Sequence, residues 1–430
     1  MNESAELILS SRRTLLPTGE QATTVVVCRG VIEEIAPYDP RRGEDLGNLC
    51  LLPGLVDTHV HLNEPGRTEW EGFETGTAAA AAGGITTLVD MPLNSSPVTT
   101  TPAALAEKLA AASSKLHVDV GFHGGVVPGN EGELESLIDA GALGLKAFMC
   151  PSGLDEFPAA GERELRSAMK VCARRDVPLL VHAELVDTTP FGSDPRSYRA
   201  YLASRPASFE RRAIALLISL CRETRSRVHI VHLADATCLP LLRTARQEGL
   251  PITVETCPHY LVFAAEEIAD GATQFKCAPP IRDAANREAL WQGLREGVID
   301  LIASDHSPCP PQLKCLETGR FDQAWGGISS LELGLSAIWT AAAERGFSLS
   351  DVIRWMGQEP AKLVLVPFGI EVHLPGNLVV FDLEEEFLVE PEHLQQRHKL
   401  TPYTGKPLRG RVRRTYVRGV PAARGTGRIL

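Results

Sequence analysis

Two histidines one residue apart are the first side chains in this sequence whose spacing suits chemistry. His59 and His61 end the run Gly54–His61, which reads GLVDTHVH. In a β-strand, residues i and i+2 point to the same face, so both imidazoles can reach one metal ion. Neutral imidazole nitrogen is a good ligand for a divalent metal such as zinc. The pair indicates a metal site, although His-x-His also occurs by chance in loops.

Three further polar side chains stand at the ends of apolar runs. His182 ends PLLVH, His232 ends VHIVH and Asp305 ends DLIASD. If these runs are parallel strands of a barrel, their carboxyl ends bring all three side chains to the same mouth. A single histidine is more often a hydrogen-bonded core residue, and His229 illustrates that alternative. Taken together, the positions favour one shared metal centre.

Lys146 stands in an apolar context, between Leu145 and Ala147. A lysine amine that loses its water needs compensation, unless the chain extends it to the surface. The other interpretation is a lysine whose pKa is low enough for the amine to take up CO₂. The resulting carbamate could bridge two metal ions. The residue types allow both interpretations.

These side chains need a scaffold that brings distant segments together. Between residues 54 and 365, eight short apolar runs alternate with helix-like segments rich in Ala, Leu, Glu and Arg. This alternation predicts an α/β fold with a closed (β/α)₈ TIM-type barrel. The eight runs are Gly54–His61, Ile85–Pro92, Val118–Gly125, Leu143–Met149, Leu179–His182, Val228–His232, Ile252–Cys257 and Leu301–Asp305. Helices are expected over Pro102–Ser114, Glu131–Ala140, Ala160–Arg174, Ser208–Glu223 and Ala284–Glu296.

The two ends of the chain predict a second, smaller domain. Strand-like runs occur at Ala5–Leu9, Thr23–Cys28 and Val31–Ile35, and again at Leu378–Phe381 and Arg411–Arg418. Because both ends have this texture, we expect residues 1–53 and 366–430 to form one small β-sandwich domain. The barrel would then comprise residues 54–365.

Composition narrows the possible partners. The 430 residues include 43 Lys and Arg against 54 Asp and Glu, a formal charge of −11. Such a balance disfavours nucleic acid and anionic membrane surfaces as partners. The most apolar stretch, Ala78–Val89, contains Gly83 and Gly84 and is too short to span a bilayer. Ten scattered cysteines without a CxxC pair, and no signal-like N-terminus, predict a cytoplasmic protein with reduced thiols.

Five elements together carry a resemblance to a known family. GLVDTHVHLNEPG, the lysine of GLKAF, His182, His232 and SDHSP occur in this order. The chain resembles the binuclear cyclic amidohydrolases over nearly its whole length. That resemblance implies two divalent metals, zinc or alternatively cobalt or manganese, and a homotetramer.

The same resemblance assigns the metal ligands. It implies that His59, His61 and Asp305 hold one metal, and that His182 and His232 hold the second. N6-carboxylated Lys146, formed with CO₂, and a hydroxide would bridge the two metals. Asp305 would be the catalytic base, which accepts the proton of the nucleophile and passes it to the departing ring nitrogen.

Residues around the expected site distinguish members of this family. Dihydroorotases have arginine where this chain has Asn63, and an amide suits a neutral ligand better than a carboxylate. Hydantoinases usually have a tyrosine where this chain has Cys150-Pro151-Ser152. Segments such as NEPGRTEWEGF, FMCPSG and HKLTPY resemble the allantoinase branch. The resemblance therefore implies hydrolytic opening of allantoin to allantoate, in purine degradation.

Two alternatives stay open at this point: a hydantoinase or dihydropyrimidinase, and a non-catalytic scaffold with the same fold. All six expected ligand positions hold competent residues, which favours an enzyme. Ala278 stands where most relatives have Ser or Asn, and His259 is expected to be a buried histidine bonded to a carbonyl. The candidate substrate contacts are Asn63, Asn94, Ser152, Cys277, Ala278, Ser307 and Gly326.

Overall fold

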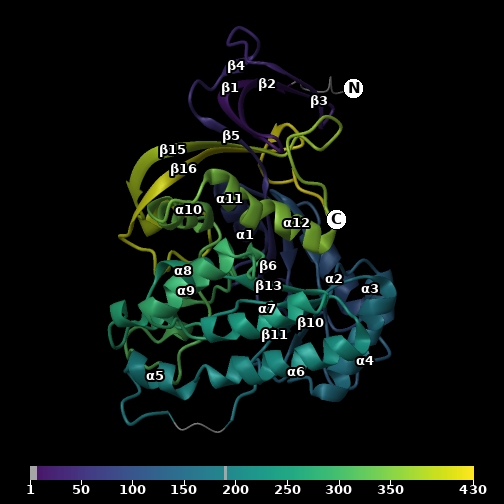
Figure 1. Cartoon of the computed structure of the whole chain (residues 1–430), viewed down its shortest axis with the longest axis vertical. Helices are drawn as coiled ribbons and strands as arrows, with labels where there is room; N and C mark the ends of the chain where they lie inside the picture. Colours follow the sequence, from purple (N-terminus) through teal and green to yellow (C-terminus); the bar gives the residue numbers. More distant parts are fainter. Residues whose placement is uncertain (1–6, 188–190) are drawn as a thin grey trace.

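The computed structural model describes residues 7–187 and 191–430. The first two residues of the expected strand Ala5–Leu9 lie outside this range, as does the start of the expected domain 1–53. A parallel barrel forms the larger part of the molecule, and a β domain lies at one end of it (Figure 1). Among the described helices, none has the length and apolar character needed to cross a membrane.

Eight parallel strand positions form the barrel, and each lies in one of the apolar runs that the sequence singled out. The strands pair in the orders β6-β7-β8 and β9-β10-β11-β12-β13-β14, and β8 and β9 are two parts of one run separated by His123. A parallel bridge between Val60 and His306 closes the ring. The strands are β6 (Leu55–Val60), β7 (Ile85–Asp90), β8 (Asp119–Phe122), β9 (Gly124–Gly125), β10 (Leu145–Phe148), β11 (Leu179–His182), β12 (Val228–Ile230), β13 (Ile252–Thr256) and β14 (Leu301–Ile302).

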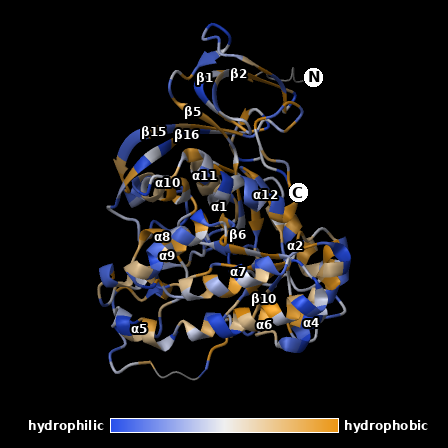
Figure 2. Cartoon of the chain, viewed as in Figure 1, coloured by the Kyte–Doolittle hydropathy of each residue, from blue (hydrophilic) through white to orange (hydrophobic). Residues whose placement is uncertain are grey.

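Several helices around the barrel have one apolar and one polar face (Figure 2). In α4 (Glu162–Arg175), Leu165, Met169 and Cys172 are buried, whereas the charged ends of the helix stay in water. All five expected helices are present, as α2 (Pro102–Ala112), α3 (Leu134–Asp139), α4, α6 (Ser208–Thr224) and α9 (Ala284–Arg295). Seven further α-helices in the described ranges were not expected from the sequence: α1 (Phe73–Ala82), α5 (Tyr198–Ser204), α7 (Leu239–Gln247), α8 (Pro258–Val262), α10 (Gly334–Glu344), α11 (Leu349–Ile353) and α12 (Glu359–Val364).

The apolar stretch Ala78–Val89 is divided between two elements of opposite type. Its first half is the end of α1, and its second half is the buried strand β7. Gly84, with a φ of 81°, makes the turn between them. Because this backbone conformation is open to glycine and strained for other residues, the sequence breaks the stretch at this position.

Strands from both ends of the chain meet in a single sheet, which makes the β domain. Its order is β17-β16-β15-β5-β1-β2-β3, and β4 pairs with β1. The joint is an antiparallel pairing in which Leu378 lies opposite Pro53. The strands are β1 (Leu7–Leu16), β2 (Gly19–Cys28), β3 (Val31–Pro37), β4 (Glu44–Asp45), β5 (Cys50–Pro53), β15 (Leu378–Leu388), β16 (Pro407–Val417) and β17 (Val420–Pro421). The predicted fold class is confirmed, while the limits at residues 53/54 and 365/366 stay a prediction.

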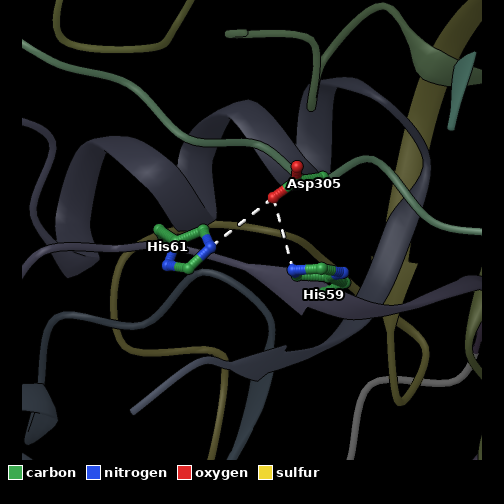
Figure 3. Close-up of side chains that lie close together, drawn as sticks. All are labelled: His59, His61 and Asp305. Carbon is green, nitrogen blue, oxygen red and sulfur yellow. Dashed lines mark ion pairs between the residues drawn. The ribbon is translucent and has the colours of Figure 1, made fainter. Parts of the chain in front are cut away.

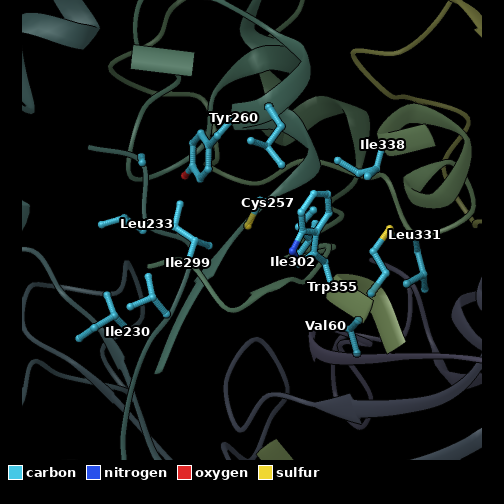
Figure 4. Close-up of a cluster of buried hydrophobic side chains, with 14 of the residues drawn as sticks. Val60, Ile230, Leu233, Cys257, Tyr260, Ile299, Ile302, Leu331, Ile338 and Trp355 are labelled. Atoms are coloured by element: carbon cyan, nitrogen blue, oxygen red, sulfur yellow. The ribbon is translucent and has the colours of Figure 1, made fainter. Parts of the chain in front are cut away.

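The main core fills the space between the barrel strands and their helices. Figure 4 shows part of it, where Val60, Cys257 and Ile302 of the barrel face Trp355 and Ile338 of the outer layer. Trp355 is fully buried. Close packing on this scale resists movement, so the ends of the strands hold functional side chains in fixed positions. All ten cysteines are free thiols, as the sequence predicted.

Candidate metal centre and substrate cavity

The first cluster of expected ligands meets at the carboxyl end of β6. One carboxylate oxygen of Asp305, Oδ1, lies 3.3 Å from Nε2 of His59 and 3.5 Å from Nε2 of His61. Figure 3 shows the carboxylate pointing between the two rings. All three side chains are buried. Two imidazole nitrogens and a carboxylate oxygen at these separations can hold a divalent cation.

The second cluster lies beside the first, at the ends of β10, β11 and β12. The rings of His182 and His232 are 4.5 Å apart between centroids, and those of His232 and His59 are 5.5 Å apart. His232 therefore lies next to members of both clusters. Lys146 comes from β10 and is completely buried.

Lys146 has an environment that does not suit an ordinary ammonium group. Its Nζ has no hydrogen-bond partner among the described residues and lies 5.1 Å from the centre of the Phe148 ring. Burial lowers the pKa of this amine to about 8, although Glu255 and Asp305 oppose the shift. A larger neutral fraction makes the amine a better nucleophile towards CO₂. The buried, unsatisfied nitrogen fits a position that is completed by a further group.

Burial and neighbouring charges also shift the pKa values of other side chains in the two clusters. Burial lowers the pKa of His232 well below its usual value, and His182 and Lys146 lower it further. Burial alone would raise the pKa of Asp305, but His59 and His61 lower it to about 2. A neutral imidazole and an ionised carboxylate are the forms that bind metals. The electrostatics of the cluster therefore favour ligand-competent side chains.

Glu255 contacts histidines of both clusters, and no sequence motif indicated it. Its Oε1 lies 2.5 Å from Nδ1 of His59 and accepts the backbone N–H of His232 at 3.0 Å. Its Oε2 lies 3.1 Å from Nε2 of His229. A carboxylate on Nδ1 leaves Nε2 of His59 free for a metal. The available signal was an acidic residue inside the apolar strand β13.

His182 is oriented by a second carboxylate. Its Nε2 lies 2.8 Å from Oε2 of Glu184, and Glu184 is itself paired with Arg205. This leaves Nδ1 of His182 for the metal cluster. Cys150 lies on the same side, because its sulfur, the His182 ring and the Glu184 carboxylate form a second group of closely spaced ligand atoms.

The backbone at Asp305 is strained and held from several sides. Its φ is 44°, a conformation that residues with side chains adopt at a cost. The next residue, His306, accepts a hydrogen bond at its carbonyl from the backbone N–H of His61 at 2.8 Å. Its ring lies 3.5 Å from Glu71, and Glu71 accepts the backbone N–H of Arg397 at 2.9 Å. The carbonyl of His306 thus ties the backbone beside Asp305 to His61, and Glu71 lies close to the His306 ring.

A cavity of about 320 Å³ opens over the two clusters. His59, His61, His182, His232 and Asp305 lie on its floor. Of the seven candidate substrate contacts, five line it: Asn94, Ser152, Ala278, Ser307 and Gly326. Asn63 and Cys277 are buried and are not among the lining residues. Asn63 instead donates a hydrogen bond to the carbonyl of Asn94 at 3.3 Å, so it supports the wall from behind.

His259 differs from its prediction. Neither of its ring nitrogens has a hydrogen-bond partner among the described residues, so the expected bond to a carbonyl is wrong. The ring is fully buried, and its ligand atoms lie close to those of Cys257 and Asp305. Burial lowers the pKa of His259 to about 4, which favours the neutral imidazole.

A buried ion pair supports the backbone next to the first cluster. Nζ of Lys108 lies 2.6 Å from Oδ2 of Asp90, and both side chains are 1% exposed. Oδ1 of Asp90 accepts the backbone N–H of Leu62 at 2.7 Å, next to His61. The pair therefore links helix α2 to the strand that carries the His-x-His motif.

Replacing Lys108 with methionine is expected to lower the free energy of unfolding by about 3–5 kcal/mol, because Asp90 would stay buried without its counter-charge. Equilibrium unfolding in denaturant measures the loss. The double variant Lys108→Met/Asp90→Asn removes both charges and should regain part of it. A single variant as stable as the native chain would contradict this account.

The chain is similar to known proteins over nearly its whole length. A model of the amidohydrolase family matches residues 50–422. An allantoinase of Streptomyces avermitilis is 50% identical, with 96% of this chain and 94% of that protein covered. An allantoinase of Arabidopsis thaliana is 47% identical over 96% of this chain and 87% of its own length. The solved structure of an L-hydantoinase (dihydropyrimidinase) from Arthrobacter aurescens is similar at a TM-score of 0.90, with 30% identity, 98% of this chain and 99% of that chain covered.

Proposed function

The chain belongs to the amidohydrolase family, and we propose that it is an allantoinase, which hydrolyses the five-membered ring of allantoin to allantoate. The observation that carries this proposal is similarity along the whole chain. Identity is 50% and 47% to two proteins named allantoinase, against 30% to the hydantoinase of similar fold. A cavity of about 320 Å³ with polar walls suits a small polar ring.

The proposed metal ligands are those named from the sequence. His59, His61 and Asp305 would hold one divalent cation, and His182 and His232 would hold the second. Lys146, as N6-carboxylysine formed from CO₂, would contribute to both. When bound, two such cations lower the pKa of a water molecule and polarise a carbonyl group of the substrate. Zinc is our first choice, with cobalt or manganese as alternatives.

Asp305 is the proposed proton carrier. As the water oxygen bonds to the ring carbonyl carbon, Asp305 accepts the water's proton. When the bond between carbon and ring nitrogen breaks, Asp305 donates that proton to the nitrogen, so the carboxylate is regenerated. The position of Asp305 supports this role, because its carboxylate lies within 3.5 Å of His59 and His61 and on the cavity floor. The strained and well-supported backbone keeps the carboxylate in that place.

The neighbours of the metal ligands keep the site ordered during this reaction. Glu255 holds His59 and His229, and Glu184 with Arg205 holds His182. Asn94, Ser152, Ala278, Ser307 and Gly326 are the proposed contacts to allantoin. Asn63 and Cys277 would act from behind the wall. A homotetramer and a cytoplasmic location stay predictions that rest on the resemblance and the sequence.

Turnover of four cyclic amides by one purified sample tests the proposal. We expect kcat/KM to be highest for allantoin, and lower for hydantoin, dihydrouracil and dihydroorotate. Metal content is measured on the same sample, after addition of zinc and bicarbonate. Fast dihydrouracil turnover without allantoin turnover would instead indicate a dihydropyrimidinase. A folded protein that hydrolyses none of the four when loaded with metal would indicate a scaffold.

A further inference from the structure

Lys314 is a fully enclosed lysine outside the metal clusters. It ends the short 3₁₀ turn Pro311–Lys314 and is 4% exposed. Its Nζ donates hydrogen bonds to the carbonyl oxygens of Lys276 at 3.1 Å and Trp325 at 3.0 Å, and also to that of Gly327. Within the described ranges, it forms no ion pair with a carboxylate. All three N–H donors of the ammonium group are therefore used by backbone carbonyls.

The three carbonyls belong to two segments that line the substrate cavity. Lys276 and Ala278 come from one segment, and Trp325, Gly326 and Gly327 come from the other. The segments also bond directly, because the N–H of Gly327 donates to the carbonyl of Lys276 at 2.8 Å. A single buried ammonium group thus joins both halves of this cavity wall.

The first of these segments is held by its carbonyls along its length. Tyr201 donates its hydroxyl to the carbonyl of Cys277 at 2.6 Å, and Tyr260 donates to that of Pro279 at 2.7 Å. Lys314 holds the carbonyl of Lys276 in the same manner. Ala278 lies between these fixed points and lines the cavity. Its backbone groups are therefore presented to the cavity in a set orientation.

In the second segment, Trp325 packs its ring against Trp70 at 4.9 Å between centroids, whereas the two glycines that follow have no side chain to hold them. Gly327 has a φ of 141°, and a Cβ at this position would collide with the carbonyl oxygen of Ser307. Gly326 likewise has no side chain to anchor it. The position of Gly326 and Gly327 therefore depends on backbone hydrogen bonds, and Lys314 donates to two carbonyls of this segment, those of Trp325 and Gly327.

We propose that Lys314 is a positioning residue that sets the backbone geometry of this cavity wall and thereby determines the affinity for the cyclic amide. A ring that carries alternating N–H and C=O groups is matched best by backbone groups held at fixed spacing. The choice of a cyclic amide as ligand rests on the proposed function. The effect on the wall itself does not, because it concerns only hydrogen bonds within this chain.

Burial makes the loss of this lysine costly, because water cannot replace its hydrogen bonds. Removing the ammonium group leaves the carbonyls of Lys276, Trp325 and Gly327 with fewer donors in a place that water reaches poorly. The segments are then expected to separate or to rotate their carbonyls towards the cavity. Burial also lowers the pKa of Lys314, while Cys309 and Cys277 oppose the shift. The metal ligands take no part in these bonds, so metal binding should be unaffected.

Lys314→Met keeps most of the side-chain length and removes all three donors, whereas Lys314→Gln keeps two of them. Lys362→Met is the matched control, because Lys362 is exposed and, among the described residues, forms its ion pair with Glu359 at 2.8 Å. Hydrogen exchange of the metal-loaded full chain is followed by mass spectrometry. We expect faster exchange in peptides containing residues 276–278 and 325–327 of Lys314→Met, and unchanged exchange around residues 57–62. If Lys314→Met does not fold, Lys314→Gln is measured in its place.

Kinetics give the second readout, with whichever cyclic amide the native chain hydrolyses. We expect KM to rise by about tenfold or more, as for a loss of binding energy common to ground and transition states. The kcat and the metal content should stay close to those of Lys362→Met, and Lys314→Gln should lie between. Unchanged exchange in both cavity segments would overturn the proposal, as would an unchanged KM. Absence of allantoin turnover by the native chain would contradict the proposed function and leave the exchange result standing.

Discussion

Replacing Asp305 with asparagine is expected to lower kcat by roughly 10²–10⁴-fold, the usual contribution of one positioned acid–base group. The amide has nearly the same shape as the carboxylate but cannot accept the proton of the attacking water. It keeps an oxygen near His59 and His61, where the carboxylate lies within 3.5 Å of both rings. We therefore expect part of the bound metal to remain. Steady-state kinetics and metal analysis on the same preparation measure the two effects separately.

Asp176→Asn is a suitable control for this variant. Asp176 ends helix α4 at a φ of 51°, a conformation that asparagine also adopts readily, and its side chain is 83% exposed. This change removes one carboxylate far from the cavity and should leave kcat unaltered. A native rate in Asp305→Asn would exclude the proposed role for Asp305. Complete loss of metal would show that its main contribution is to metal binding.

Replacing Lys146 with alanine is expected to weaken binding of the metal pair by more than about a hundredfold, since even the outer hydrogen-bond partners of metal ligands contribute 10–100-fold. The amine is buried and has no hydrogen-bond partner among the described residues. Its removal therefore breaks no bond that the fold needs, and the variant should remain folded. Metal titration of the variant and of the native chain measures the difference.

The carbamate makes a second, independent prediction for Lys146. Metal binding by the native chain should increase with bicarbonate, and labelled bicarbonate should give a carbamate signal in ¹³C NMR. Lys146→Ala should show neither effect. Acetate can enter the space left by the side chain and supply a carboxylate, so it should restore part of the metal binding. Lys362→Ala, a change at an exposed lysine, is the control. Native metal binding in Lys146→Ala would refute the bridging role.

The proximity of the proposed metal ligands was predictable because each has a local signature. His59 and His61 have the two-residue period of a strand, and His182, His232 and Asp305 each end an apolar run. In a parallel barrel, every strand delivers its last residues to the same mouth. Local pattern and general topology were therefore sufficient to bring these side chains together. The structure places them within two adjacent clusters.

Hydrogen-bond partners across the fold had no such signature. Glu255 contacts His59 across 196 residues of sequence, and Arg397 contacts Glu71 across 326. Nothing in the spacing of these residues indicates the pairing, because it depends on how packed elements are oriented. The same holds for Asn63, which was expected in the cavity and lies behind its wall.

The sequence by itself determined the alternation of barrel strands with helices, the acidic balance of charge and the side chains that form the two clusters. These follow from periodicity over a few residues and from the carboxyl ends of parallel strands, which are local properties. Only the tertiary structure decided which nitrogen of His59, His61 and His182 faces the two clusters, how Asp305 is held, and that Lys314 joins two cavity segments. Those outcomes depend on contacts between residues far apart in the chain, whose geometry exists only after the core has packed.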